Sequence, residues 1–133
     1  MSTFLDANLR VYAVSSDARG PVARDRIRGG GLVSVQVLNE FVNVALKKLR
    51  GGWPEIEQAL RYFLEAFEAV VPINLATHRA AIVIARDHKA PFYDALIVAS
   101  ALESRCEELV TEDKQDGRVF GGLTIRNPFR RNV

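Results

Sequence analysis

Residues 93–102 read YDALIVASAL, and this stretch decides which fold the sequence predicts. The pattern indicates a helix that runs from Tyr93 or Asp94 to about Arg105 and is apolar almost all the way round. A helix without a polar face has to be covered on every side, so we expect it in the middle of a domain. Asp94 stands at the start of this helix, where an aspartate is a favoured cap.

Short apolar runs on both sides of this helix predict β-strands, and helical patterns separate most of them. The alternation is typical of an α/β domain with a mainly parallel sheet. Pro72 places one run near a sheet edge, because proline cannot donate a hydrogen bond to a neighbouring strand. The predicted strands are residues 3–5, 32–35, 70–73, 108–111 and 123–125, and the predicted helices are residues 8–14, 21–28, the stretch ending at Leu49, the stretch opening at Trp53, and 75–88.

The length and composition of the chain predict one globular domain over residues 1–133. With 18 basic and 16 acidic side chains, the net charge is +2, which neither indicates nor excludes a nucleic-acid partner, although a dedicated charge-driven binder is usually more basic. Cys106 is the single cysteine, which excludes an internal disulfide, and we expect its thiol to be buried. No signal-peptide pattern opens the chain and no apolar run reaches membrane-spanning length, so we expect a soluble, cytoplasmic protein.

Arginines gather in two places, and their role has two interpretations. One is an ordinary solvated surface, and the other is a pair of patches that hold a phosphate backbone. The first group is Arg19, Arg24, Arg26 and Arg28, and the second is Arg126, Arg130 and Arg131.

Four acidic residues fall at one edge of the predicted sheet. Asp6 follows the first strand, Asp113 follows the strand over residues 108–111, Glu40 lies in the helix after the second strand, and Asp94 opens the apolar helix. Open parallel sheets bind ligands outside the carboxyl ends of their strands, close to helix N-termini. Taken singly, each acid has a structural explanation such as a helix cap or a polar loop. Together, the four acids predict a ligand-binding site at this edge of the sheet.

A cluster of carboxylates has a strong physical consequence. Two carboxylates about 4 Å apart repel by about 4 kcal/mol at an effective dielectric constant of 20. Such a cluster must hold protons or bind a cation, and oxygen ligands alone favour Mg²⁺ or Mn²⁺. One or two such ions suit the hydrolysis of a phosphodiester by an activated water.

Other chemistries fit the sequence less well. His78 and His88 lack the spacing of a metal pair, and we expect them at the surface or at helix ends. Ser34 and Ser100 have no nucleophile-elbow context, and the glycines at 29–31 indicate a plain turn. A phosphoacceptor receiver domain is rejected because the first strand ends in one acid, and because we find no lysine after a late strand in a matching position.

The acidic motifs resemble those of the PIN domain, and specifically those of VapC-type toxins, over nearly the whole chain. Asp6 lies in FLDAN, Glu40 in SVQVLNEF, Asp94 in FYDALIVASAL and Asp113 in LVTED, and the closing IRNPF is similar as well. The resemblance implies a three-layer α/β/α fold with a mainly parallel central sheet. It also implies a Mg²⁺- or Mn²⁺-dependent endoribonuclease that forms a homodimer and has a cognate antitoxin.

The resemblance also implies roles for individual residues. Asp6, Asp94 and Asp113 would bind metal, and Glu40 would bind it or orient the attacking water. Asn8 and Thr111 could add to the site. Either Asp116 or Glu112 could share or replace the role of Asp113.

The chain departs from the family at one position. The family usually has a threonine or serine after the first aspartate, where this chain has Ala7, which removes a hydroxyl expected near the metal. Ala7 therefore favours an alternative hypothesis, a PIN-like module that binds RNA or a protein without cutting.

Overall fold

The computed structural model describes residues 2–13, 17–48, 50–112, 114 and 116–129. Its centre is a sheet with the strand order β3-β2-β1-β4-β6-β5. All neighbouring strands run parallel except β5 and β6, which are antiparallel. The strands are β1 (Thr3–Leu5), β2 (Leu32–Ser34), β3 (Ala69–Val71), β4 (Glu108–Val110), β5 (Val119–Phe120) and β6 (Leu123–Arg126).

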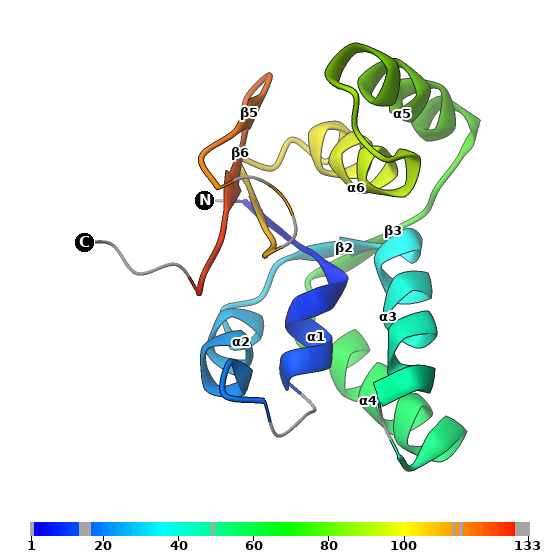
Figure 1. The fold of residues 1–133 in the computed structure, drawn as a ribbon, viewed down its shortest axis with the longest axis vertical. Helices are drawn as coiled ribbons and strands as arrows, with labels where there is room; N and C mark the ends of the chain where they lie inside the picture. The colour runs from blue at the N-terminus through cyan, green and yellow to red at the C-terminus, as the bar shows by residue number, and fades with distance from the viewer. Residues whose placement is uncertain (1, 14–16, 49, 113, 115, 130–133) are drawn as a thin grey trace.

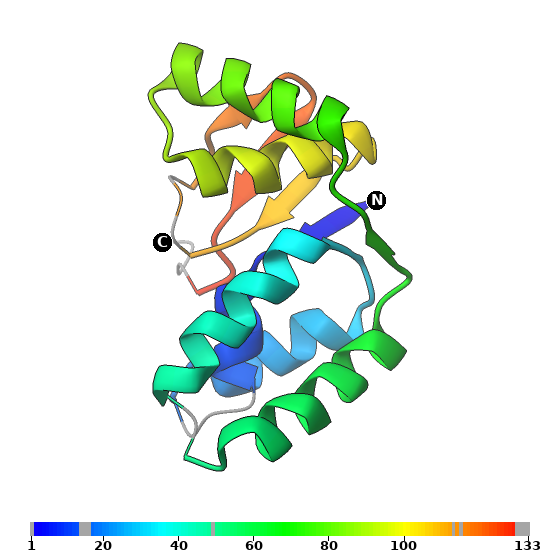
Figure 2. The same ribbon diagram turned by 90° about the vertical axis from the view of Figure 1, so that its right-hand side faces the viewer.

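Helices cover both faces of this sheet (Figures 1 and 2). Figure 1 shows α5 and α6 stacked together on one side, while the other helices gather on the opposite side. The predicted three-layer α/β/α arrangement with a mainly parallel sheet is therefore confirmed. The helices are α1 (Ala7–Ala13), α2 (Gly20–Arg28), α3 (Val35–Lys48), α4 (Gly52–Ala66), α5 (Leu75–His88) and α6 (Phe92–Glu103).

The apolar helix lies where the sequence predicts it. Residues 95–101 of α6 are all buried, and α6 contacts α3, α5, β2 and β4. Its first residue is Phe92 and its N-cap is Pro91, so the expectation that Asp94 caps this helix was wrong. Asp94 instead lies inside the first turn, which still places its carboxylate at the positive end of the helix dipole.

Most predicted elements are present with ends shifted by one to three residues. The sequence missed the two-residue strand β5, which is too short to show a hydrophobic period. Pro72 follows β3, which is an edge strand as predicted. The glycines at 29–31 form a turn in which Gly30 and Gly31 have φ of 82° and 132°, backbone values that side-chain-bearing residues rarely adopt.

Two expectations about burial had different outcomes. Cys106 is buried, as expected. Trp53 lies in the first turn of α4 and is 55% exposed, although a tryptophan on an amphipathic helix more often packs into the core. None of the described helices is long and apolar enough to cross a membrane.

The strand order also locates a crevice. From β1 the chain continues outward to β2 and β3, and then crosses to β4 on the other side of β1. In open α/β sheets, ligands bind at this reversal point, outside the carboxyl ends of the two strands that flank it. The residues that follow β1 and β4 are Asp6 and Thr111, so these two positions mark the expected site.

Candidate active site

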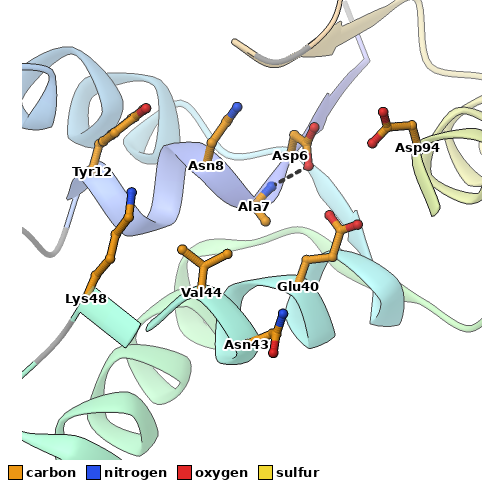
Figure 3. Close-up of a pocket in the computed structure, with 9 residues that line it drawn as sticks. All are labelled: Asp6, Ala7, Asn8, Tyr12, Glu40, Asn43, Val44, Lys48 and Asp94. Carbon is orange, nitrogen blue, oxygen red and sulfur yellow. Dashed lines mark hydrogen bonds between the residues drawn. The ribbon is translucent and has the colours of Figure 1, made fainter. Parts of the chain in front are cut away.

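Three of the four predicted acids line one cavity of about 360 Å³. Asp6 comes from the end of β1, Glu40 from the middle of α3 and Asp94 from the first turn of α6. Figure 3 shows the carboxylates of Glu40 and Asp94 pointing toward Asp6 from two different helices. The structure thus brings together acids that are 34 and 54 positions apart along the chain, which is the convergence predicted from the carboxyl ends of parallel strands.

Asp6 is the buried centre of this group. Its Oδ1 accepts a hydrogen bond from the Ala7 backbone N–H at 2.6 Å. Its Oδ2 accepts from the Thr111 hydroxyl at 2.7 Å and from the Lys114 ammonium at 2.8 Å. Burial alone would raise the pKa of Asp6, but Lys114, Thr111 and the Ala7 N–H together lower it below its ordinary value. Asp6 is therefore held as a carboxylate in a fixed orientation.

Lys114 is the residue of this site that sequence reasoning missed. Its Nζ lies 2.8 Å from Asp6 Oδ2 and 3.5 Å from Asp94 Oδ1, and its side chain is 9% exposed. Burial works to lower the pKa of Lys114, but the facing carboxylates of Asp6, Asp94 and Glu40 raise it above its ordinary value. The sequence offered one signal for its place in the site, namely its position four residues after the end of β4.

This lysine also corrects one argument from the sequence. We expected no lysine after a late strand in a position matching that of a receiver domain, and this was wrong, because Lys114 follows β4 and contacts the acid after β1. A receiver domain is still excluded by topology. Its strand order is 2-1-3-4-5, in which β1 lies between β2 and β3, whereas here β1 lies between β2 and β4.

Glu40 has a different electrostatic environment from Asp6. It is half-buried, and it faces the carboxylates of Asp6 and Asp94. Burial, followed by the repulsion from Asp6, raises the pKa of Glu40 to about 7, although Lys114 partly opposes the shift. Near neutral pH the carboxyl group of Glu40 can therefore both accept and release a proton, which suits a general base.

The remaining predicted residues are divided between this cavity and other places. Asn8 lines the cavity, and both polar atoms of its side chain are buried without a hydrogen-bond partner in the part of the chain that the structure describes. Thr111 is in place against Asp6. Asp113 lies outside the described residues. Asp116 accepts a hydrogen bond from the Asn127 backbone N–H at 2.8 Å and lines a different cavity.

Glu112, the other alternative to Asp113, is engaged elsewhere. Its Oε1 accepts from Arg19 Nη1 at 2.7 Å. Arg26 likewise pairs with Glu108 at 2.8 Å. The first arginine group therefore uses part of its charge on ion pairs within the protein, which favours the interpretation as an ordinary surface over a phosphate patch.

The donor set of the cavity suits a hard divalent cation. Oxygen ligands, which Mg²⁺ and Mn²⁺ prefer, are offered by the carboxylates of Asp6, Glu40 and Asp94 and by the amide of Asn8. As they stand, no three acidic, histidine or cysteine side chains among the described residues are close enough together to hold an ion. A cationic group already lies between Asp6 and Asp94, namely the Lys114 ammonium. The acidic residues of the cavity therefore suit a cation, and in this structure the Lys114 ammonium group takes that place.

Asp94 also lines a second cavity, of about 240 Å³, to which Lys114 contributes as well. Its remaining charged lining comes from Lys89 and Arg118. Arg118 Nη2 donates to the His88 carbonyl oxygen at 3.2 Å, and its guanidinium lies 4.6 Å from the centre of the Phe120 ring. This basic cavity, with Arg118 held in place, therefore directly adjoins the acidic one.

The family model described as PIN domain matches residues 3–119. No curated protein matches the chain. Among similar solved structures, a toxin–antitoxin complex from Klebsiella pneumoniae is 21% identical, with 98% of this chain and 100% of that chain covered and a TM-score of 0.73. VapC20 from Mycobacterium tuberculosis, described as a sarcin–ricin loop cleaving toxin, is 19% identical, with 81% of this chain and 87% of that chain covered and a TM-score of 0.69. VapBC2 from Rickettsia felis, bound to promoter DNA, is 18% identical, with 96% of this chain and 98% of that chain covered and a TM-score of 0.71. At these identities the likeness establishes the fold.

Proposed function

This chain belongs to the PIN domain family, and on that premise we propose that it is a metal-dependent endoribonuclease that hydrolyses RNA phosphodiesters as the toxin of a toxin–antitoxin pair. The observation that carries the proposal is the convergence of Asp6, Glu40 and Asp94 on one cavity. Carboxylates brought together from three elements repel each other, and a protein keeps such a cluster where it binds a cation.

Asp6 and Asp94 would hold the divalent ion, with Asp113 as the further ligand that the family resemblance implies. The Asn8 amide oxygen is an additional donor in the same cavity. When bound, Mg²⁺ or Mn²⁺ neutralises charge on the phosphate oxygens and makes water a better nucleophile. Thr111 and the Ala7 N–H keep the carboxylate of Asp6 in one orientation, so that it meets the ion without a rearrangement.

Glu40 would receive the proton of the attacking water on its carboxylate. In the metal-free protein burial and the neighbouring carboxylates raise the pKa of Glu40 to about 7, and a divalent ion at the same carboxylates would lower it and keep Glu40 ionised, ready to accept a proton. Lys89 and Arg118 in the adjoining basic cavity would hold a phosphate next to the scissile one. The acids and the basic residues then act on neighbouring positions of one RNA strand.

The antitoxin is a proposal that rests on the structural neighbours, since the Klebsiella pneumoniae structure is described as a toxin–antitoxin complex. A homodimer is part of the proposal as well. Large exposed apolar side chains, Trp53 on α4 and Tyr93 on α6 among them, offer surface that partner chains would cover. Sedimentation of the purified protein measures the oligomeric state, and co-expression with the product of the adjacent gene tests the antitoxin.

Cleavage of total RNA by the purified protein tests the activity. We expect cleavage with Mg²⁺ or Mn²⁺, none with chelator, and a loss of at least about a hundredfold in Asp94→Asn. Asp87→Asn, on the exposed end of α5, is the matched control for the same chemical change. If Asp94→Asn cuts as fast as the wild type, the assignment of this cavity as the active site is wrong.

Two observations favour a second function, in which the chain is a PIN-like module that binds RNA or a protein without cutting it. Ala7 lacks the hydroxyl that the family usually has, and Lys114 already neutralises Asp6 without any metal. Calorimetric titration with Mn²⁺ separates the two functions, because a module without catalysis has no need for an ion at these carboxylates.

A further inference from the structure

Lys114 lies in the place that a cation bound by Asp6 and Asp94 would take. Its Nζ is 2.8 Å from Asp6 Oδ2 and 3.5 Å from Asp94 Oδ1, and both aspartates are proposed metal ligands. The Lys114 side chain is 9% exposed, so its ammonium group has exchanged most of its water for these two carboxylates.

The contact matters for the protein without metal. The side chain of Asp6 is 3% exposed, and a buried carboxylate without a counter-charge is costly. Removing one partner of a buried ion pair leaves the other charge uncompensated, which destabilises more than the pair itself stabilises. Lys114 therefore does for Asp6 in the metal-free protein what a bound ion would do.

An ammonium group and a divalent ion cannot both lie between the same two carboxylates. Both are positive, and the repulsion between them is large at such short range away from bulk water. Lys114 and Asp94 also line the second cavity, of about 240 Å³, so open space adjoins the lysine side chain. A displaced ammonium group would turn into this space.

We infer that Lys114 is a resident cation of the acidic site, which a divalent ion must displace in order to bind. Metal binding in this chain is then a competition between the ion and the protein's own ammonium group. The inference rests on the proposed function, because it takes the acidic cavity as the metal site.

Calorimetric titration with Mn²⁺ alone tests the competition. We expect Lys114→Met to bind Mn²⁺ about tenfold tighter than the wild type, since the competing positive charge is gone. Lys47→Met, which removes an exposed lysine in the last turn of α3, controls for the change in net charge. Equal or weaker binding by Lys114→Met would overturn the inference and leave the proposed function standing. Absence of Mn²⁺ binding in both proteins would overturn the two together.

A second measurement uses the wild-type protein, so it does not depend on the folding of Lys114→Met. The protein is acetylated briefly with an amine-reactive ester with and without saturating Mn²⁺, and each lysine is quantified by mass spectrometry. We expect Lys114 to be protected without Mn²⁺ and to react severalfold faster with it, while Lys47 reacts equally in both. Protection of Lys114 that persists at saturating Mn²⁺ would show that the ion binds beside the lysine instead of displacing it.

Discussion

The hydroxyl of Thr111 donates a hydrogen bond to Asp6 Oδ2 over a distance of 2.7 Å, and both side chains are buried. The bond joins the residue after β4 to the residue after β1, at the point where the order of the strands reverses. It therefore connects the end of β4 to the end of β1, and it fixes one carboxylate oxygen of Asp6, which lines the acidic cavity.

Replacing Thr111 with valine keeps the shape of the side chain and removes this hydrogen bond. Because the acceptor is a buried carboxylate, we expect the free energy of unfolding to fall by about 1–3 kcal/mol. We expect RNA cleavage to fall about tenfold to a hundredfold, since orientation of a metal ligand by its hydrogen-bond partner has effects of that size. Urea unfolding and cleavage rates measure the two effects.

Thr124→Val on β6 is the matched control, because it makes the same change in the sheet away from the cavity. Its free energy of unfolding should stay within about 0.5 kcal/mol of the wild-type value. Wild-type cleavage by Thr111→Val would mean that the hydrogen bond has no part in holding Asp6 for catalysis.

The fold and the acidic group were largely predictable from sequence, for physical reasons that differ between residues. The apolar helix, the strand ends and the edge strand with Pro72 follow from periodicity and backbone chemistry. The approach of Asp6, Glu40 and Asp94 follows from the parallel strands, whose carboxyl ends meet at one edge of the sheet. Such placement needs no knowledge of side-chain packing.

Lys114 and Asp116 show where prediction from the sequence fails. Both follow β4 in the same loop, yet one side chain reaches Asp6 and the other accepts a hydrogen bond from the Asn127 backbone. The direction that a loop side chain takes depends on the path of the loop and on its contacts with distant segments. Neither hydrophobic period nor strand order contains that information.

Glu40 makes the stability of the metal-free protein depend on pH. Its pKa is about 7 in the folded protein and close to the ordinary glutamate value of 4.5 in the unfolded chain. The folded state therefore binds the extra proton between these values, so the stabilisation is complete below pH 4.5 and is lost as the pH rises through 7. Relative to Glu40→Gln, which cannot ionise, the wild type should lose stability over this window.

Because Glu40 is half-exposed, solvent screening reduces the difference to about 1 kcal/mol. Urea unfolding of wild type and Glu40→Gln in chelator, from pH 4 to 9, measures it. Glu57→Gln, an exposed position on α4, controls for the loss of a carboxylate elsewhere. Parallel stability curves for wild type and Glu40→Gln would refute the raised pKa of Glu40.

Arg118 should contribute to RNA affinity through the basic cavity. Its guanidinium is held by the Phe120 ring and the His88 carbonyl oxygen, so a phosphate meets a preorganised donor. We expect Arg118→Ala to weaken binding of single-stranded RNA and to reduce the slope of log affinity against log salt by about 1. Binding is measured in chelator, which prevents cleavage, at several salt concentrations.

Arg61→Ala on the exposed face of α4 is the control for loss of one positive charge. It should leave the salt slope as in the wild type, because α4 does not line the basic cavity. Equal slopes for Arg118→Ala and Arg61→Ala would place the RNA somewhere other than this cavity.

Ala7 is the position that best separates a nuclease from a module that binds without cutting. Its side chain is 5% exposed and lines the acidic cavity between Asp6 and Asn8. A threonine there adds a hydroxyl close to the carboxylates, and we expect cleavage with Mn²⁺ to rise about tenfold, the equivalent of one hydrogen bond. Ala7→Val adds the same volume without the hydroxyl and should give no gain. A gain in both variants would assign the effect to packing at the start of α1, and a gain in neither would mean that this chain does not need a hydroxyl at position 7.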